Sequence, residues 1–225
     1  MSQAKEDKIY TVQPVSDGDV DEIMNLLRRT FYVDEPLNDA IELYSEDTPC
    51  PELDEYCRHS LLEGLSFKAV SKQGRIVGVT ISGVSPLHDR NGTDMLKQAE
   101  QCKNPKFQKI LYILTQREEG ARLWERYPDE KEMVEVHVAA TDENWRKLGI
   151  MNKLMEETEN ATKKRGFHLL RLDTSSFYSA KSAERLGFTC VHRALYKDIT
   201  KDGQPLIVPK PPHIEDRVNI KVLTT

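Results

Sequence analysis

The fold is decided by residues 134–165, which read VEVHVAATDENWRKLGIMNKLMEETENATKKR. Valines alternate with polar residues from Met133 to Ala140, and this period predicts a half-buried strand. From Leu148 to Arg165 apolar residues recur at helical spacing, the last turn is basic, and Gly166 follows as a stop signal. The segment therefore predicts a strand, a turn and a helix.

The turn between the two elements predicts an anion site. A helix N-terminus presents unpaired backbone N–H groups and a partial positive charge, and a basic neighbour adds to the attraction. Gly149 has no Cβ, so phosphate oxygens can approach its backbone closely. We expect a pyrophosphate here, although a dinucleotide-binding G-x-G-x-x-G and a P-loop G-K-[ST] are absent. The residues expected at this site are Arg146, Lys147, Leu148, Gly149, Ile150 and Met151.

Segments on both sides of this unit alternate between strand and helix patterns. Upstream, the expected elements are a strand at 8–15, a helix from Ser16 to Val33, a helical stretch between 38 and 62 broken by Pro49 and Pro51, a hairpin of 67–71 and 75–84 around Lys72-Gln73-Gly74, and a helical connection at 86–132. Downstream, they are a strand at 168–173, a helix at 180–186, a strand at 188–195 and an edge strand near 218–222. The sum predicts an α/β (α+β) fold in one domain, 1–225, with a mixed central sheet of about seven strands flanked by helices on both faces.

Composition narrows the functional classes. A net charge of -5 argues against a general nucleic-acid binder, which needs a basic face. The sequence has no run of about 18 apolar residues and no secretory leader, so we expect a cytoplasmic protein without a membrane segment. The four cysteines lack C-x-x-C spacing and are expected to be free thiols. A zinc site at Cys50, Cys57 and His59 is the alternative to a protein without a metal.

The turn resembles the acetyl-CoA signature of the GNAT superfamily, which is Arg or Gln, two residues, Gly, one residue, then Gly or Ala. Arg146 and Gly149 match, while Met151 replaces the small residue. A second match is Arg185-Leu186-Gly187-Phe188, which looks like the family's Lys-Leu-Gly-Phe. The resemblance implies acetyl-CoA as co-substrate, held by the turn and by the strand backbone at Val138, Ala139, Ala140 and Thr141. A tyrosine common in the family is Ala183 here, so another group must protonate the leaving thiolate.

Two further stretches resemble the insect arylalkylamine (dopamine-type) N-acetyltransferases. They are FYVDEPLN at 31–38 and SSFYSAK at 175–181, and KPPH at 210–213 also agrees. The resemblance implies that Glu35 is the general base, that Asp34 helps to attract the ammonium group, and that Ser175 and Ser179 contact the cofactor and supply the general acid. Tyr178 is the reserve acid. A base is needed because an aliphatic amine, with a pKa of about 10.4, arrives mostly protonated.

We therefore predict transfer of acetyl from acetyl-CoA to an arylalkylamine such as dopamine, serotonin, tyramine or octopamine, by direct attack in a ternary complex of a monomeric enzyme. Alternatives are another amine (a polyamine, a hydrazine-like amine or a protein amino group) and an inactive acetyl-CoA-binding module. Residue-level alternatives also stand. Ser175 and Ser179 fit helix capping, and His137 fits either a substrate contact or an ordinary sheet position.

Overall fold

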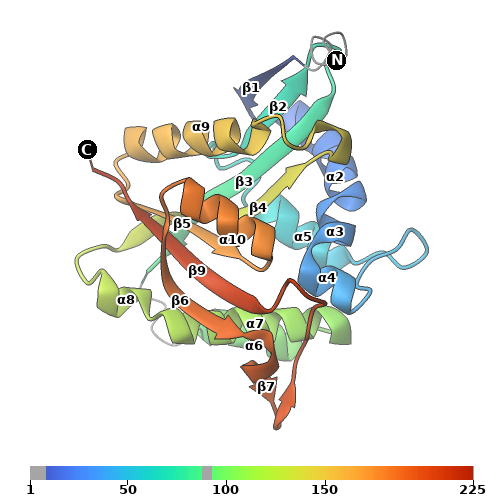
Figure 1. The fold of residues 1–225 in the computed structure, drawn as a ribbon, viewed down its shortest axis with the longest axis vertical. Coiled ribbons are helices and arrows are strands. Elements are labelled where there is room, and N and C mark those ends of the chain that lie inside the picture. The colour runs from blue at the N-terminus through green and yellow to red at the C-terminus, as the bar shows by residue number, and fades with distance from the viewer. Residues whose placement is uncertain (1–8, 88–92, 225) are drawn as a thin grey trace.

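A seven-stranded mixed sheet organises the chain in a computed structural model that describes residues 9–87 and 93–224 (Figure 1). Its strands are β1 (Tyr10–Pro14), β2 (Phe67–Ser71), β3 (Ile76–Pro86), β4 (Glu132–Thr141), β5 (Leu169–Thr174), β6 (Thr189–Leu195) and β9 (Glu215–Val222). The order is β1-β2-β3-β4-β5-β9-β6; β4 and β5 pair in parallel, and the other neighbours are antiparallel. A separate small hairpin joins β7 (Thr200–Lys201) and β8 (Gln204–Pro205).

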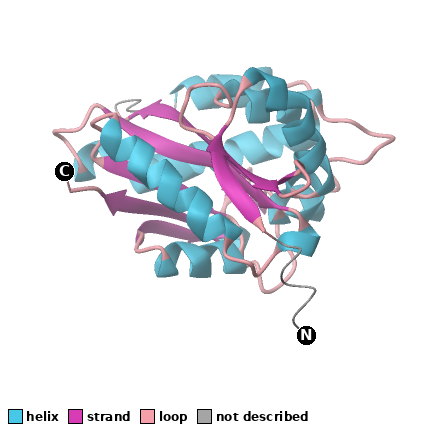
Figure 2. Cartoon of the chain, turned by 90° about the horizontal axis from the view of Figure 1, so that it is seen from above, coloured by secondary structure: helices cyan, strands magenta, loops and turns pink. Residues whose placement is uncertain are grey.

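Helices cover both faces of this sheet (Figure 2). One face carries α9 (Ile150–Lys164) and α10 (Phe177–Arg185). The other carries α2 (Val20–Arg29), α3 (Phe31–Asp34), α4 (Pro36–Ala40), α5 (Pro51–His59), α6 (Thr93–Gln101), α7 (Pro105–Ala121) and α8 (Leu123–Arg126). Short 3-10 turns lie at Asp17–Asp19, Glu143–Trp145 and Tyr196–Asp198. The predicted mixed sheet with helices on both faces is confirmed. No helix in the described part of the chain is long and apolar enough to cross a membrane.

The expected edge strand near 218–222 is not at an edge. β9 runs from Glu215 to Val222 and inserts between β5 and β6, so β6 forms the edge. Its residues Val218 and Ile220 are buried, which an inner position requires. β9 lies inside the sheet because it pairs with both β5 and β6. The sequence of β9 alone does not show which strands it pairs with.

The valine alternation of β4 is interrupted at His137. Residues Ile81 and Ser82 of β3 pair with Val138 and Val136, so His137 is an extra residue that has no partner on β3. Such a β-bulge changes the face to which the following side chains point. Val136 accordingly packs in the core under α9 and α10, whereas Val138 packs in the core under α2, α5 and α7.

Several element ends differ from the expected ones for local reasons. The first helix divides at Thr30, whose hydroxyl bonds the Leu26 carbonyl at 2.7 Å, and Pro36 then opens α4. The glycine turn precedes α9, which begins at Ile150 rather than Leu148, because Gly149 is left-handed at φ +79°. Part of the expected 86–132 connection, residues 88–92, lies outside the described residues.

Candidate functional site

The parallel strands at the centre of the sheet separate and leave a cavity. β4 and β5 pair only from Val134–Leu170 to Val136–Leu172, although β4 continues to Thr141 along β3 and β5 continues to Thr174 along β9. The edge of β4 that faced β5 therefore has no strand partner after Val136. A cavity of about 620 Å³ opens there, lined from β4, β5, the α3–α4 turn, α5, α7 and the start of α10.

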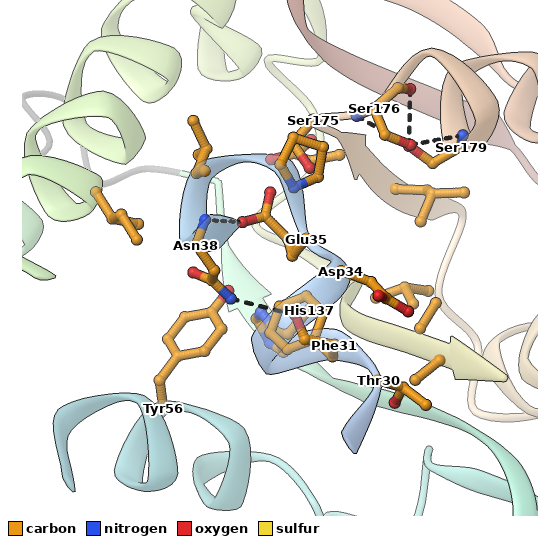
Figure 3. Close-up of a pocket in the computed structure, with 18 of the residues that line it drawn as sticks. Thr30, Phe31, Asp34, Glu35, Asn38, Tyr56, His137, Ser175, Ser176 and Ser179 are labelled. Atoms are coloured by element: carbon orange, nitrogen blue, oxygen red, sulfur yellow. Dashed lines mark hydrogen bonds between the residues drawn. The ribbon is translucent and has the colours of Figure 1, made fainter. Parts of the chain in front are cut away.

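Glu35 lies in this cavity, on the turn that joins α3 to α4. Its carboxylate accepts a hydrogen bond from the Asn38 backbone N–H at 2.8 Å and so caps α4 (Figure 3). Burial raises the pKa of Glu35, and this rise is opposed by the Ser175 hydroxyl and by the backbone N–H groups of Asn38 and Leu37. A carboxylate with a raised pKa is a better proton acceptor than an exposed one.

Ser175 and Ser179 both line the cavity, but their surroundings differ. Ser175 precedes α10 and lies next to Glu35 (Figure 3). Ser179 is in the first turn of α10 and forms a capping box with Ser176: their hydroxyls are 2.8 Å apart, and each also bonds the other's backbone. The helix therefore uses Ser179, together with the unpredicted Ser176, to satisfy its first N–H groups.

The predicted cofactor segment lies at one end of the same opening. Ala139, Ala140, Thr141 and Arg146 line the cavity, whereas Val138 is buried below it. Arg146 contacts the Thr141 carbonyl at 3.3 Å and forms an ion pair with Asp34, so it bridges the turn and α3.

The rest of the predicted turn is organised around two left-handed residues. Lys147 is exposed with φ +64°, and Gly149 is left-handed as well. The Leu148 carbonyl accepts a hydrogen bond from the Tyr10 hydroxyl at 3.3 Å. Ile150 is buried against the sheet, and Met151 packs partly into the same core. Packing thus occupies Ile150 and Met151, and the backbone and basic side chains of the turn remain outside.

The wall of the cavity opposite α10 is apolar and aromatic. α5 supplies Leu53 and Tyr56, and α7 supplies Phe107, Ile110 and Leu114. The bulged His137 also lines the cavity, and its ring makes an edge contact with Tyr56 at 6.2 Å between centroids (Figure 3). His137 thus lies at a bulge on the cavity wall, and its contact with a substrate stays a prediction.

A layer of buried charges forms the floor between α7 and the sheet. Arg117 binds Asp216 through two hydrogen bonds of 2.7 and 2.6 Å and Asp173 at 3.1 Å. Arg171, almost fully buried, binds Asp173 and Glu118. The carboxylates hold the pKa of Arg117 well above its usual range against the cost of burial. Both arginines therefore remain charged.

Sequence reasoning missed most of this floor. Arg117, Glu135, Asp173 and His213 line the cavity without having been predicted as site residues. Glu135 was visible as a polar residue of the alternating strand, but a helical arginine such as Arg117 gives no local signal. His213 accepts a hydrogen bond from the Phe177 backbone N–H at 3.2 Å, and its ring packs against Tyr178. Tyr178, the reserve acid, lines the cavity with its side chain largely exposed.

The zinc alternative involves Cys50, Cys57 and His59. Cys50 and Cys57 are buried, and burial raises the pKa of their thiols to about 11 and about 12. Among the residues that the structure describes, no group of three or more His, Cys, Asp or Glu side chains could hold a metal ion.

Comparisons with known proteins agree with this geometry. The model of the acetyltransferase (GNAT) family matches residues 20–188. A crystal structure of arylalkylamine N-acetyltransferase 2 from Aedes aegypti superimposes with a TM-score of 0.88 at 25% identity, covering 96% of this chain and 99% of that one. A polyamine N-acetyltransferase of Drosophila melanogaster, which catalyses the formation of N-acetylagmatine, gives 0.85 at 25% identity, covering 96% and 100%. An apo agmatine N-acetyltransferase mutant gives 0.86 at 25% identity, covering 95% and 99%.

Proposed function

Because this chain belongs to the GNAT family of acetyltransferases, we propose that it moves the acetyl group of acetyl-CoA directly onto a small primary amine, with both substrates bound in the cavity between β4 and β5. The observation that carries the proposal is the position of Glu35. This partly buried carboxylate with a raised pKa shares one cavity with the unpaired edge of β4 and with the serine-rich start of α10. No covalent enzyme intermediate is needed.

The residues around the turn fit acetyl-CoA. Gly149 is the N-cap of α9 and has no side chain that could bond the first N–H groups of the helix, so these groups stay available. Arg146 and Lys147 add positive charge for a pyrophosphate. The unpaired edge of β4 at Ala139–Thr141 offers backbone groups to the pantetheine arm. When bound, acetyl-CoA supplies an activated thioester. Backbone N–H groups of this edge would stabilise the negative charge that develops on the thioester oxygen.

Glu35 is proposed as the general base. An amine enters as its ammonium, Glu35 takes one proton from nitrogen directly or through water, and the free amine attacks the thioester carbon. The carbon–nitrogen bond forms and the carbon–sulfur bond breaks. The nitrogen then loses a second proton to become an amide, and this proton restores the one that the general acid gives to the thiolate. Asp34 is committed to Arg146 in the structure, so its proposed part is to add negative charge at the entrance.

The departing CoA thiolate needs a proton, for which the chain offers three hydroxyls. Ser175 is the best placed because it lies next to Glu35 and, unlike Ser179, is not part of the α10 capping box. Tyr178 is exposed at the cavity rim. We therefore assign the acid to Ser175 and the capping role to Ser179, with Tyr178 in reserve.

Two substrate classes fit the cavity. Arylalkylamines suit the aromatic and aliphatic wall formed by α5 and α7, and the similar mosquito structure is named for that activity. Amines with a second cationic group are the other class, since two of the similar structures are named for agmatine or its product.

The experiment that tests the function is thiol release from acetyl-CoA by purified protein. The panel contains dopamine, serotonin, tyramine, agmatine, cadaverine, hydrazine and a lysine peptide. Turnover with any small amine, abolished by Glu35→Gln, supports the proposal. Tight acetyl-CoA binding without turnover on any amine would instead identify an inactive acetyl-CoA-binding module.

A further inference from the structure

Glu135 is the carboxylate of the cavity that the buried charge layer holds most loosely, through a long ion pair with Arg171. Its Oε1 lies 3.7 Å from Arg171 Nε and 3.8 Å from His137 Nδ1, and its Oε2 accepts a hydrogen bond from the Ser85 hydroxyl at 3.0 Å. These are its shortest polar contacts among the residues that the structure describes. Its side chain keeps 16% of its surface exposed, and it lines the cavity.

The neighbouring arginines direct their short hydrogen bonds to carboxylates other than Glu135. Arg171 directs Nε and Nη2 to Asp173 and both Nη atoms to Glu118. Arg117 directs its donors to Asp216 and Asp173. Two guanidinium groups are thus already matched by three carboxylates before Glu135 is counted. The floor of the cavity carries an excess of negative charge, and Glu135 is where that excess meets the cavity.

A second carboxylate of the cavity also lacks an ion pair. Glu35 forms no salt bridge within the described part of the chain, whereas the Asp34 and Asp173 carboxylates are each neutralised by an arginine. Glu35 and Glu135 belong to different walls, the α3–α4 turn and β4. Apolar side chains of α5 and α7 line the same cavity.

Building on the proposed function, we propose that Glu135 is a specificity-determining residue that binds a second positive charge at the far end of the amine substrate. The preferred substrate class is then a primary amine with an apolar spacer and a terminal ammonium or guanidinium group. Glu35 deprotonates the reacting end, and Glu135 binds the end that stays charged. An arylalkylamine would use the same apolar wall but leave Glu135 without a cationic partner.

The test compares pairs of amines that differ only in the second charge: cadaverine with pentylamine, and putrescine with butylamine. For the unaltered protein we expect kcat/KM for the diamine to exceed that for the matched monoamine roughly 10- to 100-fold, the range of a charge-assisted hydrogen bond. Glu135→Gln, which keeps the side-chain shape, should bring that ratio down toward one. Glu135→Asp keeps the charge and should retain part of the preference.

Glu118→Gln is the matched control. It removes a carboxylate from the same charge layer, bound to the same Arg171, but Glu118 does not line the cavity. Its diamine-to-monoamine ratio should stay that of the unaltered protein. The assignment would be overturned if the diamine-to-monoamine ratio of kcat/KM were the same in the unaltered protein and in Glu135→Gln. It would also be overturned if Glu118→Gln lowered that ratio as much as Glu135→Gln does.

A missing acetyltransferase activity can be told apart from a missing cation subsite. If no amine is acetylated, the proposed function fails, and calorimetric binding of cadaverine against pentylamine still tests the subsite. Stronger binding of cadaverine that is lost in Glu135→Gln would support the subsite even then. Equal binding of the two amines would refute it. Melting curves of each variant show whether a loss reflects misfolding.

Discussion

Replacing Glu35 by Gln separates its proposed chemistry from its structural role. The Gln side chain retains an oxygen that can accept the hydrogen bond from the Asn38 N–H, so the cap of α4 is preserved. It cannot accept the proton of an ammonium group. General-base catalysis contributes about 100- to 10,000-fold to a rate, and we expect kcat/KM to fall within that range at neutral pH.

The same variant should lose activity without losing stability. Burial raises the pKa of Glu35 above the ordinary 4.5, so the folded state binds more protons than the unfolded state between the two pKa values. In that window the free energy of unfolding therefore falls as pH rises, and above the folded pKa the full cost of the buried charge is present. Glu35→Gln removes this cost, and its melting temperature at neutral pH should equal or exceed that of the unaltered protein.

Glu35→Ala is the contrasting variant. It also removes the buried charge, but it loses the cap, which costs about 0.5–2 kcal/mol. Because α4 has only five residues, it depends on that cap. A cost of about 1 kcal/mol would place Glu35→Ala roughly 2–4 °C below Glu35→Gln in a chain of this size.

The assay is thiol release across the acidic to neutral range, paired with thermal melts of each variant. In the unaltered protein, kcat/KM should fall as pH drops through the raised pKa of Glu35, and this limb should vanish in Glu35→Gln. A Glu35→Gln enzyme that keeps its rate and its acid limb would remove Glu35 from the chemistry. A Glu35→Gln melting temperature well below that of Glu35→Ala would refute the separation of cap from charge.

Three shorter predictions concern other parts of the site. Ser175→Ala should lower kcat about tenfold or more because its proposed role is proton donation, and the acid limb of its rate should move to higher pH because the Ser175 hydroxyl opposes the raised pKa of Glu35. Ser179→Ala should instead keep most of kcat and lose about 1 kcal/mol of stability with the capping box; identical kinetics in the two variants would contradict this division. Gly149→Ala should cost about 1–2 kcal/mol and weaken acetyl-CoA binding in calorimetry, since its φ of +79° is strained for a residue with a Cβ; its nearest neighbour, a hydroxyl at 3.9 Å, excludes a clash as the cause. Asp216→Asn should destabilise by about 1–3 kcal/mol in urea unfolding, because Arg117 loses charge-assisted hydrogen bonds to Asp216 but keeps Asp173; an unchanged free energy of unfolding would show that this pair is not needed.

Local patterns were sufficient for the features that depend on neighbouring residues. Strand period, helix period and the glycine turn are properties of consecutive residues, and the strand–turn–helix unit at 132–164 formed as expected apart from its ends. The strand at 189–195 and the helix before it were found in the same way. The placement of β9 was wrong because a strand's neighbours are decided by pairing across long sequence separations.

Other features failed for a related reason. The bulge at His137 appears only when β4 is aligned on β3, so the simple alternation placed Val138 on the wrong face. The capping box of α10 was predicted only in part, since Ser179 was recognised and Ser176 was not. An extra residue in one strand or one more serine in a serine-rich run gives no distinct signal in the sequence.

The charge layer explains why the cavity floor was hidden from sequence and also why it can select a substrate. Arg117 reaches partners 56 and 99 residues away, so no spacing rule could join them. Once formed, such a buried network resists rearrangement, because separating either arginine from its carboxylates leaves an uncompensated charge. Glu135 therefore keeps only a 3.7 Å contact with Arg171 Nε, because the short hydrogen bonds of Arg171 go to Asp173 and Glu118. Its negative charge stays directed at the cavity, and a cationic group of the substrate is the partner that neutralises it without breaking the network.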